Sequence, residues 1–244
     1  MRFGVKSDKG MVRETNEDSY NVIAGYSGIP VTFVIADGMG GHNSGEIASK
    51  MAVDSVSNSI LKMKERFENQ EDVSGILRAV IHEANTNVYA ASNEHNENHG
   101  MGTTLIVAIV CQRTLYIGHV GDSRVYLVRN NSISQITTDH SFIEELVRNG
   151  TLTREEAENH PKKNIITRAL GCSENIEVDT YSTDIKEDDI FVLCTDGLSN
   201  MLSNNEILNI VMNIDDPELA SSQLLDVANT KGGEDNITVV VFKN

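Results

Sequence analysis

Aspartates directly follow several apolar runs, and they recur from the first quarter of the 244-residue chain to its last. The clearest cases are Asp37, Asp122 and Asp196. A carboxylate at the end of a strand is held on a rigid element and still reaches solvent. If the fold brings several such carboxylates together, they repel one another unless a cation neutralises them. The pattern therefore predicts a divalent-metal site to which distant parts of the chain contribute.

Two further aspartates fit the same interpretation. Asp18 lies in a polar N-terminal stretch, and Asp235 stands just before the last apolar run, 237–242. An Asp-Gly pair taken alone is more typical of an ordinary turn. Because Asp-Gly occurs at both 37–38 and 196–197, each time beside an apolar run, we favour a shared site over separate turns.

The segment expected to follow the strand 31–36 is rich in glycine, with three glycines at positions 38–42. Such a backbone can approach an ion closely, so the Gly38 carbonyl could add an oxygen ligand beside the Asp37 carboxylate. Mn²⁺ and Mg²⁺ both prefer oxygen ligands, so the residue types do not choose between them.

Hydrophobic patterns predict strands and helices along the chain. The expected strands are 31–36, 104–110, 114–120, 125–128, 133–136, 190–195 and 237–242. The expected helices are 45–66, 74–93, 141–149, 154–159, 204–212 and 217–229. Consecutive strands between 103 and 137 favour antiparallel pairing, and continuously apolar runs indicate burial on both faces. We therefore predict an α+β fold of two antiparallel sheets with helices outside them.

The chain is long enough for one large domain or two small ones. Three prolines and the lack of any low-complexity stretch leave little material for a linker. The polar segment from about 138 to 171 interrupts the strand series and holds two short predicted helices. We interpret it as a small flap over a sheet edge, where it could gate an active site.

Acidic residues outnumber basic ones by 36 to 20, which gives a net charge of -16. Such a surface repels nucleic acid and anionic membranes, so neither is expected as a partner. The N-terminus has no apolar signal segment, and the longest apolar run is too short to span a bilayer. Three widely spaced cysteines without metal-ligand spacing indicate a reduced, cytoplasmic protein with buried free thiols.

Six short motifs occur in order along the chain. They are Arg13-x-x-Asn16-x-Asp18, Asp37-Gly-Met-Gly-Gly-His42 with Gly45-Glu46, Gly102-Thr-Thr104, His119-Val-Gly-Asp-Ser-Arg124, Thr195-Asp-Gly-Leu198 and Asp235-Asn236. This ordered set covers nearly the whole chain and resembles the metal-dependent type-2C serine/threonine protein phosphatases, the PPM family, in their compact bacterial form. The segment from Asp139 to Gly171 also resembles the flap of that family.

The resemblance implies an αββα sandwich that forms one catalytic domain, 1–244, with the flap at about 138–171. The metal ligands that it implies are Asp18, Asp37, the Gly38 carbonyl, Asp122, Asp196 and Asp235. Asp37 would bridge two Mn²⁺ or Mg²⁺ ions, and Asp18 would complete this cluster directly or through a water. Asp122 would hold a third ion together with Asp196.

The implied reaction is hydrolysis of phosphoserine and phosphothreonine in proteins. A water that bridges two cations becomes hydroxide near neutral pH and attacks phosphorus in line. Arg13 would bind the substrate phosphate, although spacing alone favours a surface salt bridge with Glu14 or Glu17. The implied partners are phosphorylated proteins, including a serine/threonine kinase of the same bacterial cell, and we expect a monomer.

Two features remain open at this point. In many eukaryotic members a histidine after the first Asp-Gly is the proposed general acid, but here that position is Met39. Either a metal-bound water or His42 would then protonate the leaving group, and for His42 a structural role is favoured over catalysis. The basic pair Lys162–Lys163 is either part of a solvated loop or a feature that draws phosphorylated substrates toward the site.

Other classes of function fit the residues less well. A cysteine phosphatase needs an arginine six residues after its cysteine, and none of the three cysteines has one. An aspartyl-phosphate hydrolase needs Asp-x-Asp at a strand end, and both Asp-Gly sequences lack the second acid. A binding module or inactive relative is disfavoured because all the matching acids and Arg13 are present. Mn²⁺-dependent hydrolysis of p-nitrophenyl phosphate would distinguish these alternatives.

Overall fold

The computed structural model describes residues 1–40, 44–69, 72–94, 96–158, 160–162 and 164–244. The strands are β1 (Arg2–Asp8), β2 (Asp18–Ile23), β3 (Val31–Met39), β4 (Gly102–Thr103), β5 (Leu105–Cys111), β6 (Thr114–Val120), β7 (Arg124–Arg129), β8 (Ser132–Gln135), β9 (Asp179–Asp184), β10 (Ile190–Cys194) and β11 (Ile237–Lys243). The helices are α1 (Ser44–Lys62), α2 (Lys64–Glu68), α3 (Val73–Glu94), the 3-10 turn η1 (Asn96–Asn98), α4 (Phe142–Arg148), α5 (Arg154–Glu158), α6 (Asp196–Ser199), α7 (Asn204–Asn213) and α8 (Pro217–Thr230).

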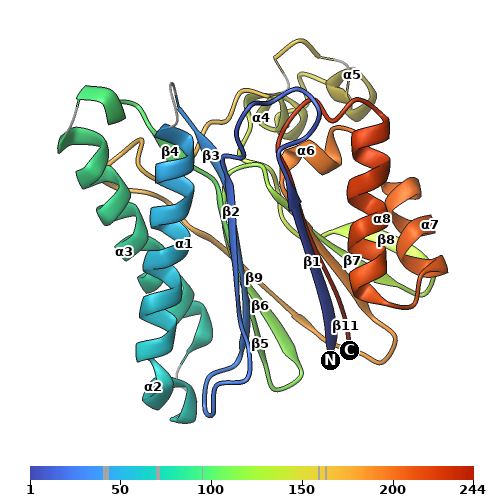
Figure 1. The fold of residues 1–244 in the computed structure, drawn as a ribbon, viewed down its shortest axis with the longest axis horizontal. Coiled ribbons are helices and arrows are strands. Elements are labelled where there is room, and N and C mark those ends of the chain that lie inside the picture. The colour runs from blue at the N-terminus through green and yellow to red at the C-terminus, as the bar shows by residue number, and fades with distance from the viewer. Residues whose placement is uncertain (41–43, 70–71, 95, 159, 163) are drawn as a thin grey trace.

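These strands form two sheets that pack face to face (Figure 1). One sheet has the order β1-β11-β10-β7-β8, and the other has the order β2-β3-β5-β6-β9, with the short strand β4 paired to β3. Every neighbouring pair is antiparallel. Helices α1 and α3 cover the outer face of the second sheet, and α7 and α8 cover that of the first. The predicted αββα sandwich is confirmed.

The central apolar layer lies between the two sheets. Within it, the ring of Phe242 stacks on Phe33 at 4.9 Å and on Phe191 at 4.7 Å between centroids. Along β5, Ile106 faces this layer, whereas Val107 faces the helices. Both side chains are fully buried, and such burial stabilises a fold by about 1.5–3 kcal/mol per large apolar side chain. The continuously apolar strands therefore follow from a sheet that is covered on both faces.

Sequence patterns miss β1, β2 and β9, as well as the short elements β4 and α6. The three longer strands all lie at the edge of a sheet. An edge strand has a neighbouring strand on one side only, and its side chains are more exposed, so polar residues are tolerated there. Strand β9, for example, reads Asp-Thr-Tyr-Ser-Thr-Asp. The predicted helix 45–66 is also divided, because α1 ends at Lys62 and α2 begins at Lys64.

Strand β3 is longer than the apolar pattern predicts. It continues through Asp37 and Gly38 to Met39, because β4 pairs with its last two residues. The interpretation of Asp37-Gly38 as a turn after the strand is therefore wrong, and the Asp37 carboxyl is fixed by the strand itself. Residues 41–43, which include His42, lie outside the described part of the chain.

The segment between β8 and β9 connects the two sheets. Isolated bridges join Ser141 to Ile166 and Thr103 to Leu170, so both ends of the segment are tied down. Its two short helices, α4 and α5, lie at the end of the sandwich where α6 lies, away from the chain termini (Figure 1). A capping box starts α5, since Thr153 and Glu156 each accept a hydrogen bond from the backbone amide of the other.

All three cysteines are free, but they differ in exposure. Cys194 is buried in β10 and Cys111 is half-buried. The prediction of buried thiols is wrong for Cys172, which is exposed in the turn that follows the bridge at Leu170. Among the described helices, none is both long and apolar enough to cross a membrane.

Candidate metal centre

The fold gathers the five aspartates singled out in the sequence at one end of the sandwich. Asp18 is the first residue of β2, Asp37 lies in β3, Asp122 lies in the turn between β6 and β7, Asp196 is the first residue of α6 and Asp235 precedes β11. Asp18 and Asp37 are opposite each other in the β2–β3 ladder. Loss of solvent raises the pKa of Asp37 well above its usual value, and the charges of the other four aspartates raise it further. The other four carboxyls therefore all lie within electrostatic reach of Asp37.

Two hydroxyls hold the buried Asp18 carboxylate. Thr195 Oγ1 and Thr238 Oγ1 donate to Asp18 Oδ2 at 2.9 and 2.7 Å. Burial raises the pKa of Asp18 to about 7, although both hydrogen bonds lower it. Sequence patterns do not identify either threonine as part of the site. Thr195 could have been found from its place directly before Asp196, whereas Thr238 is only a polar residue inside an apolar strand.

The Asp37 and Asp196 carboxyls lie close enough for Asp37 to lower the pKa of Asp196. Asn200 Nδ2 donates to Asp196 Oδ2 at 3.0 Å. Loss of solvent and the charge of Asp235 nevertheless raise the pKa of Asp196 to about 6. Two carboxyls this close require either a proton or a cation between them.

Asp122 lies in a turn that requires glycine at the preceding position. The preceding residue, Gly121, has a φ of 109°, and a Cβ there would lie 2.6 Å from the side chain of Thr104. Burial and the charge of Asp196 raise the pKa of Asp122 to about 8. The turn therefore holds a carboxylate in surroundings that disfavour its negative charge.

Within the described part of the chain, three enclosed carboxylate oxygens have no hydrogen-bond partner, namely Oδ1 of Asp18, Asp122 and Asp196. Such an oxygen is destabilising unless it is paired, and a cation would pair it. Among the described residues, no three acidic, histidine or cysteine side chains already converge as a finished metal site. The fit to a divalent cation rests instead on these unpartnered oxygens and on the raised pKa values, both of which a bound cation would relieve.

Gly38 lies where β3 and the start of α1 approach most closely. A Cβ on Gly38 would lie 2.1 Å from the carbonyl oxygen of Gly45, and a Cβ on Gly45 would lie 2.8 Å from that of Gly38. Only glycine at both positions permits this approach. The Gly38 carbonyl directly follows Asp37, where it could join a set of oxygen ligands.

Arg13 pairs with an aspartate of the cluster rather than with either neighbouring glutamate. Its Nη2 donates to Asp235 Oδ2 at 2.9 Å, and half of its side chain remains exposed. The guanidinium therefore stands at the rim of the cluster, with donors still available to solvent.

Asn236 anchors the N-terminal segment that carries Arg13 and Asp18. Its Oδ1 accepts from the Glu17 amide at 2.8 Å, and its Nδ2 donates to the Thr15 carbonyl at 2.8 Å. The sequence showed the Asp235-Asn236 pair, but it did not predict that Asn236 bonds the N-terminal backbone. Two segments more than 200 residues apart are thus joined beside the aspartates.

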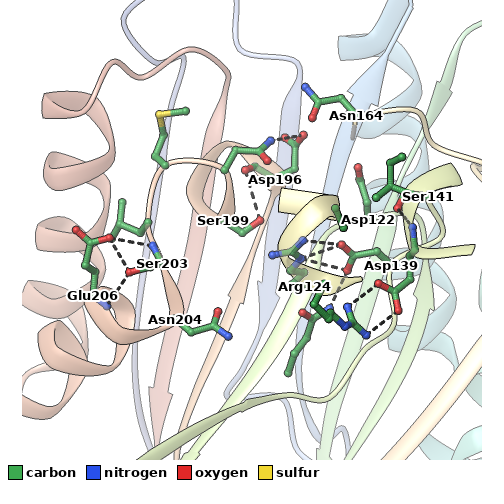
Figure 2. Close-up of a pocket in the computed structure, with 18 of the residues that line it drawn as sticks. Asp122, Arg124, Asp139, Ser141, Asn164, Asp196, Ser199, Ser203, Asn204 and Glu206 are labelled. Carbon is green, nitrogen blue, oxygen red and sulfur yellow. Dashed lines mark hydrogen bonds and ion pairs between the residues drawn. The ribbon is translucent and has the colours of Figure 1, made fainter. Parts of the chain in front are cut away.

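A cleft of about 740 Å³ opens beside Asp122 and Asp196 (Figure 2). One wall comes from the segment between β8 and β9, and the other comes from α6 and α7. Three ion pairs line it, namely Arg124–Asp139, Arg154–Glu144 and Lys231–Glu206. The cleft therefore leads along a polar surface to two of the clustered carboxylates.

The remaining residues singled out in the sequence lie around this end of the molecule or outside the described part. Met39 is the half-buried last residue of β3. Lys162 lies in a turn after α5, with its Nζ 5.7 Å from the centre of the Phe142 ring. Lys163 and His42 are outside the described residues.

Comparison with known proteins agrees with this geometry. A family model described as "Protein phosphatase 2C" matches residues 11–226. The serine/threonine phosphatase stp of Listeria welshimeri is 39% identical over 243 residues, which are 100% of this chain and 96% of that protein.

Solved structures give the same result at the level of the fold. A serine/threonine phosphatase of S. agalactiae superposes with a TM-score of 0.90 at 33% identity, covering 100% of this chain and 99% of that one. The catalytic domain of the serine/threonine protein phosphatase PstP, solved in complex with two manganese ions, gives a TM-score of 0.83 at 34% identity, with 98% and 96% covered.

Proposed function

The chain belongs to the protein phosphatase 2C family, and we propose that it removes phosphate from phosphoserine and phosphothreonine in proteins at the five clustered aspartates. The activity is that of a metal-dependent serine/threonine phosphatase, a hydrolase of phosphate monoesters. The observation that carries the site assignment is the set of three enclosed, unpartnered carboxylate oxygens. They lie on three different elements that only the folded chain brings together.

Each aspartate receives its role from its surroundings. Asp37 would bridge two ions, because its carboxyl lies close to that of Asp196 and the charges of the other four aspartates raise its pKa. Asp235 and the Gly38 carbonyl would be further ligands, and Asp18 would act directly or through a water. Bound Mn²⁺ or Mg²⁺ would supply the Lewis acid that acidifies a water near neutral pH and neutralises phosphoryl charge.

Arg13 would bind the substrate phosphate. Its guanidinium sits at the rim and keeps donors free while it pairs with Asp235. A guanidinium presents two parallel donors to a phosphate, so it can hold and orient the group over the aspartates. The charge of Asp235 keeps Arg13 near the site before the substrate arrives.

Asp122 would hold a third ion with Asp196. Both carboxylates border the cleft, and each has one enclosed oxygen without a partner. We expect this ion to bind more weakly than the first two, because it has the fewest protein ligands. Mg²⁺ could take the place of Mn²⁺ throughout, since both suit an all-oxygen site.

The chain would act as a single domain, 1–244, with the segment at about 138–171 as a flap that forms one wall of the cleft. A serine/threonine kinase of the same cell would be its counterpart, and the enzyme would be a cytoplasmic monomer. The net charge of -16 supports a protein that avoids nucleic acid and anionic membranes.

The proposed site is tested with phosphothreonine and phosphoserine peptides, in chelator-treated protein to which Mn²⁺ or Mg²⁺ is returned. We expect phosphate release only with added metal. Asp37→Asn should lower kcat/KM by about 10³-fold, because metal stabilisation of the transition state is worth several kcal/mol. Metal-dependent release that survives in Asp37→Asn would show that the site lies elsewhere, and no release with either metal would favour a binding module.

A further inference from the structure

Hydrogen bonds hold Gly121, Ser123 and Arg124, the residues around Asp122 in its turn. The amide of Gly121 donates to His140 Nδ1 at 3.0 Å, and its carbonyl accepts from the His140 amide at 2.8 Å. One residue of the segment after β8 therefore fixes both polar groups of Gly121. Because Gly121 has no Cβ to restrict its backbone, these two bonds determine its conformation.

The other side of the turn is held by the neighbour of His140. Asp139 accepts from Arg124 Nε at 2.9 Å and from Arg124 Nη2 at 2.7 Å. Gln135 Nε2 donates to the same carboxylate at 2.7 Å. Figure 2 shows Asp139 paired with Arg124. Asp139 and His140, consecutive in the chain, thus bind Arg124 and Gly121, the residues on either side of Asp122 and Ser123.

Ser123 is held from the opposite direction, by the second sheet. Its carbonyl accepts from His119 Nε2 at 2.8 Å, and its hydroxyl bonds Thr104 Oγ1 at 2.9 Å. Thr104 Oγ1 in turn accepts from the Asp37 amide at 2.9 Å. The turn is therefore connected to the strand that carries the central aspartate.

The ring of His140 is itself fixed. Gly121 N–H is a donor, so Nδ1 must be unprotonated and Nε2 carries the proton of the neutral ring. Nε2 lies 3.0 Å from Arg168 Nη1 and 3.4 Å from Asp179 Oδ2, and Arg168 Nη1 donates to Asp179 Oδ1 at 2.8 Å. His140 thus has only one ring orientation that serves Gly121.

Repulsion within the cluster would favour rotation of Asp122 away from Asp196. The hydrogen bonds that His140 and Asp139 make to the turn oppose this rotation. We propose that His140, supported by Asp139, is a positioning residue that aims the Asp122 carboxylate at the cation shared with Asp196. This inference rests on the ligand role proposed for Asp122. It places a metal-affinity determinant at the base of the segment that forms the cleft wall, where movement of that segment would reach the weakest-held ion.

The test compares two amide replacements of similar polarity. Asn places its oxygen near the Nδ1 position and can still accept from Gly121, whereas Gln reaches toward the Nε2 position and cannot. Mn²⁺ binding is measured by isothermal titration calorimetry on full-length, chelator-treated protein. We expect His140→Gln to weaken the weakest Mn²⁺ step about 10-fold and His140→Asn to keep it within about 3-fold, since ligand-supporting residues typically contribute 10–100-fold.

Further variants separate positioning from general destabilisation. Asp122→Asn should abolish the weakest step, and His140→Gln should have no additional effect in that background. Asp189→Asn, which breaks a similar aspartate–arginine pair at the far end of β7, should lower stability without changing Mn²⁺ affinity. If His140→Gln does not fold, Asp139→Asn replaces it, with the same loss of affinity expected.

The possible outcomes point to different errors. Equal affinities for His140→Gln and His140→Asn, or wild-type affinity for the replacement Asp139→Asn, would overturn the positioning role while the ligand role of Asp122 stands. Wild-type binding by Asp122→Asn would instead show that the proposed ligand role is wrong, and the positioning role would fall with it.

Discussion

Strand β10 has an aspartate at each end, and the two have opposite surroundings. Asp189, just before the strand, is buried, and it accepts from Arg129 Nε at 2.8 Å and from Arg129 Nη2 at 2.7 Å. Burial alone would raise its pKa, but Arg129 and the Lys186 amide lower it below the usual value. Asp196, just after the strand, has no cationic partner at hydrogen-bond distance among the described residues, and its pKa is raised to about 6.

The comparison shows that enclosure of an acid does not by itself indicate a functional site. The charge of the Asp189 carboxylate is balanced by the Arg129 guanidinium, so Asp189 contributes to the stability of the fold. Asp196 stands among other acids with an unpartnered oxygen, so it is destabilising until something positive binds. The partner, and not the burial, distinguishes a structural aspartate from a candidate ligand.

The largest effect that tests this comparison is expected from Asp196→Asn. Loss of one anionic ligand should lower kcat/KM by about 10²–10³-fold at saturating Mn²⁺. The chelator-treated variant should be as stable as the wild type or slightly more stable, because one repelling charge is gone. Activity is followed with a phosphothreonine peptide and stability by urea unfolding. A variant that is destabilised but active would place Asp196 in the same class as Asp189.

The pH dependence of stability should have opposite signs at the two ends. The raised pKa values of Asp196, Asp18 and Asp122, about 6, 7 and 8, contribute stability that is complete below the unfolded value near 4 and is lost as the pH rises through 6 to 8. The lowered pKa of Asp189 contributes stability above that value, which is lost as the pH falls below it.

Urea unfolding of chelator-treated protein should therefore show stability falling by several kcal/mol between pH 5 and pH 8, since each pKa unit corresponds to about 1.4 kcal/mol. Added Mn²⁺ should remove most of this fall at pH 8, because it binds only the folded state. If stability falls less with pH in Asp196→Asn than in the wild type, the fall comes from the aspartate cluster and not from the general repulsion within a chain of net charge -16. Stability that rises with pH in the absence of metal would contradict the assignment.

The opposite phenotype is expected for Asp189→Asn. It leaves the Arg129 guanidinium, which is 26% exposed, without its counter-charge. The free energy of unfolding should drop by about 2 kcal/mol, somewhat less than for a fully buried pair. kcat/KM with Mn²⁺ should stay at the wild-type value, measured in parallel with the Asp196 variant. A loss of activity larger than twofold would mean that the two ends of β10 are not independent.

The smallest effect is expected from changing Lys162 and Lys163 together to Glu. If this pair draws phosphorylated substrates, kcat/KM should fall about 2–3-fold at low salt and recover at high salt, with kcat unchanged. The matched control changes Lys62 and Lys64, at the opposite end of the molecule, by the same charge (Figure 1). Equal effects of the two double variants would mean that Lys162 and Lys163 act only as ordinary surface charge.

The sequence by itself determined the sandwich and the acids. Six apolar runs indicated strands in the interior of the sheets, because burial on both faces leaves a continuously apolar pattern that is visible in the local sequence. The recurring Asp-Gly pairs beside these runs indicated carboxylates at strand ends. The ordered motifs then assigned them to a family, which the comparisons show.

Only the tertiary structure decided which strands pair and which side chains are hydrogen-bonded to the aspartates. Edge strands β1, β2 and β9 leave a weak pattern, because their stability comes from one neighbour distant in the chain. Thr238 and Asp18 are 220 positions apart, and Arg13 and Asp235 are 222 apart. Hydrogen bonds over such separations leave no local periodicity, so the hydroxyls on Asp18 and the grip of His140 on Gly121 became visible only in the folded chain.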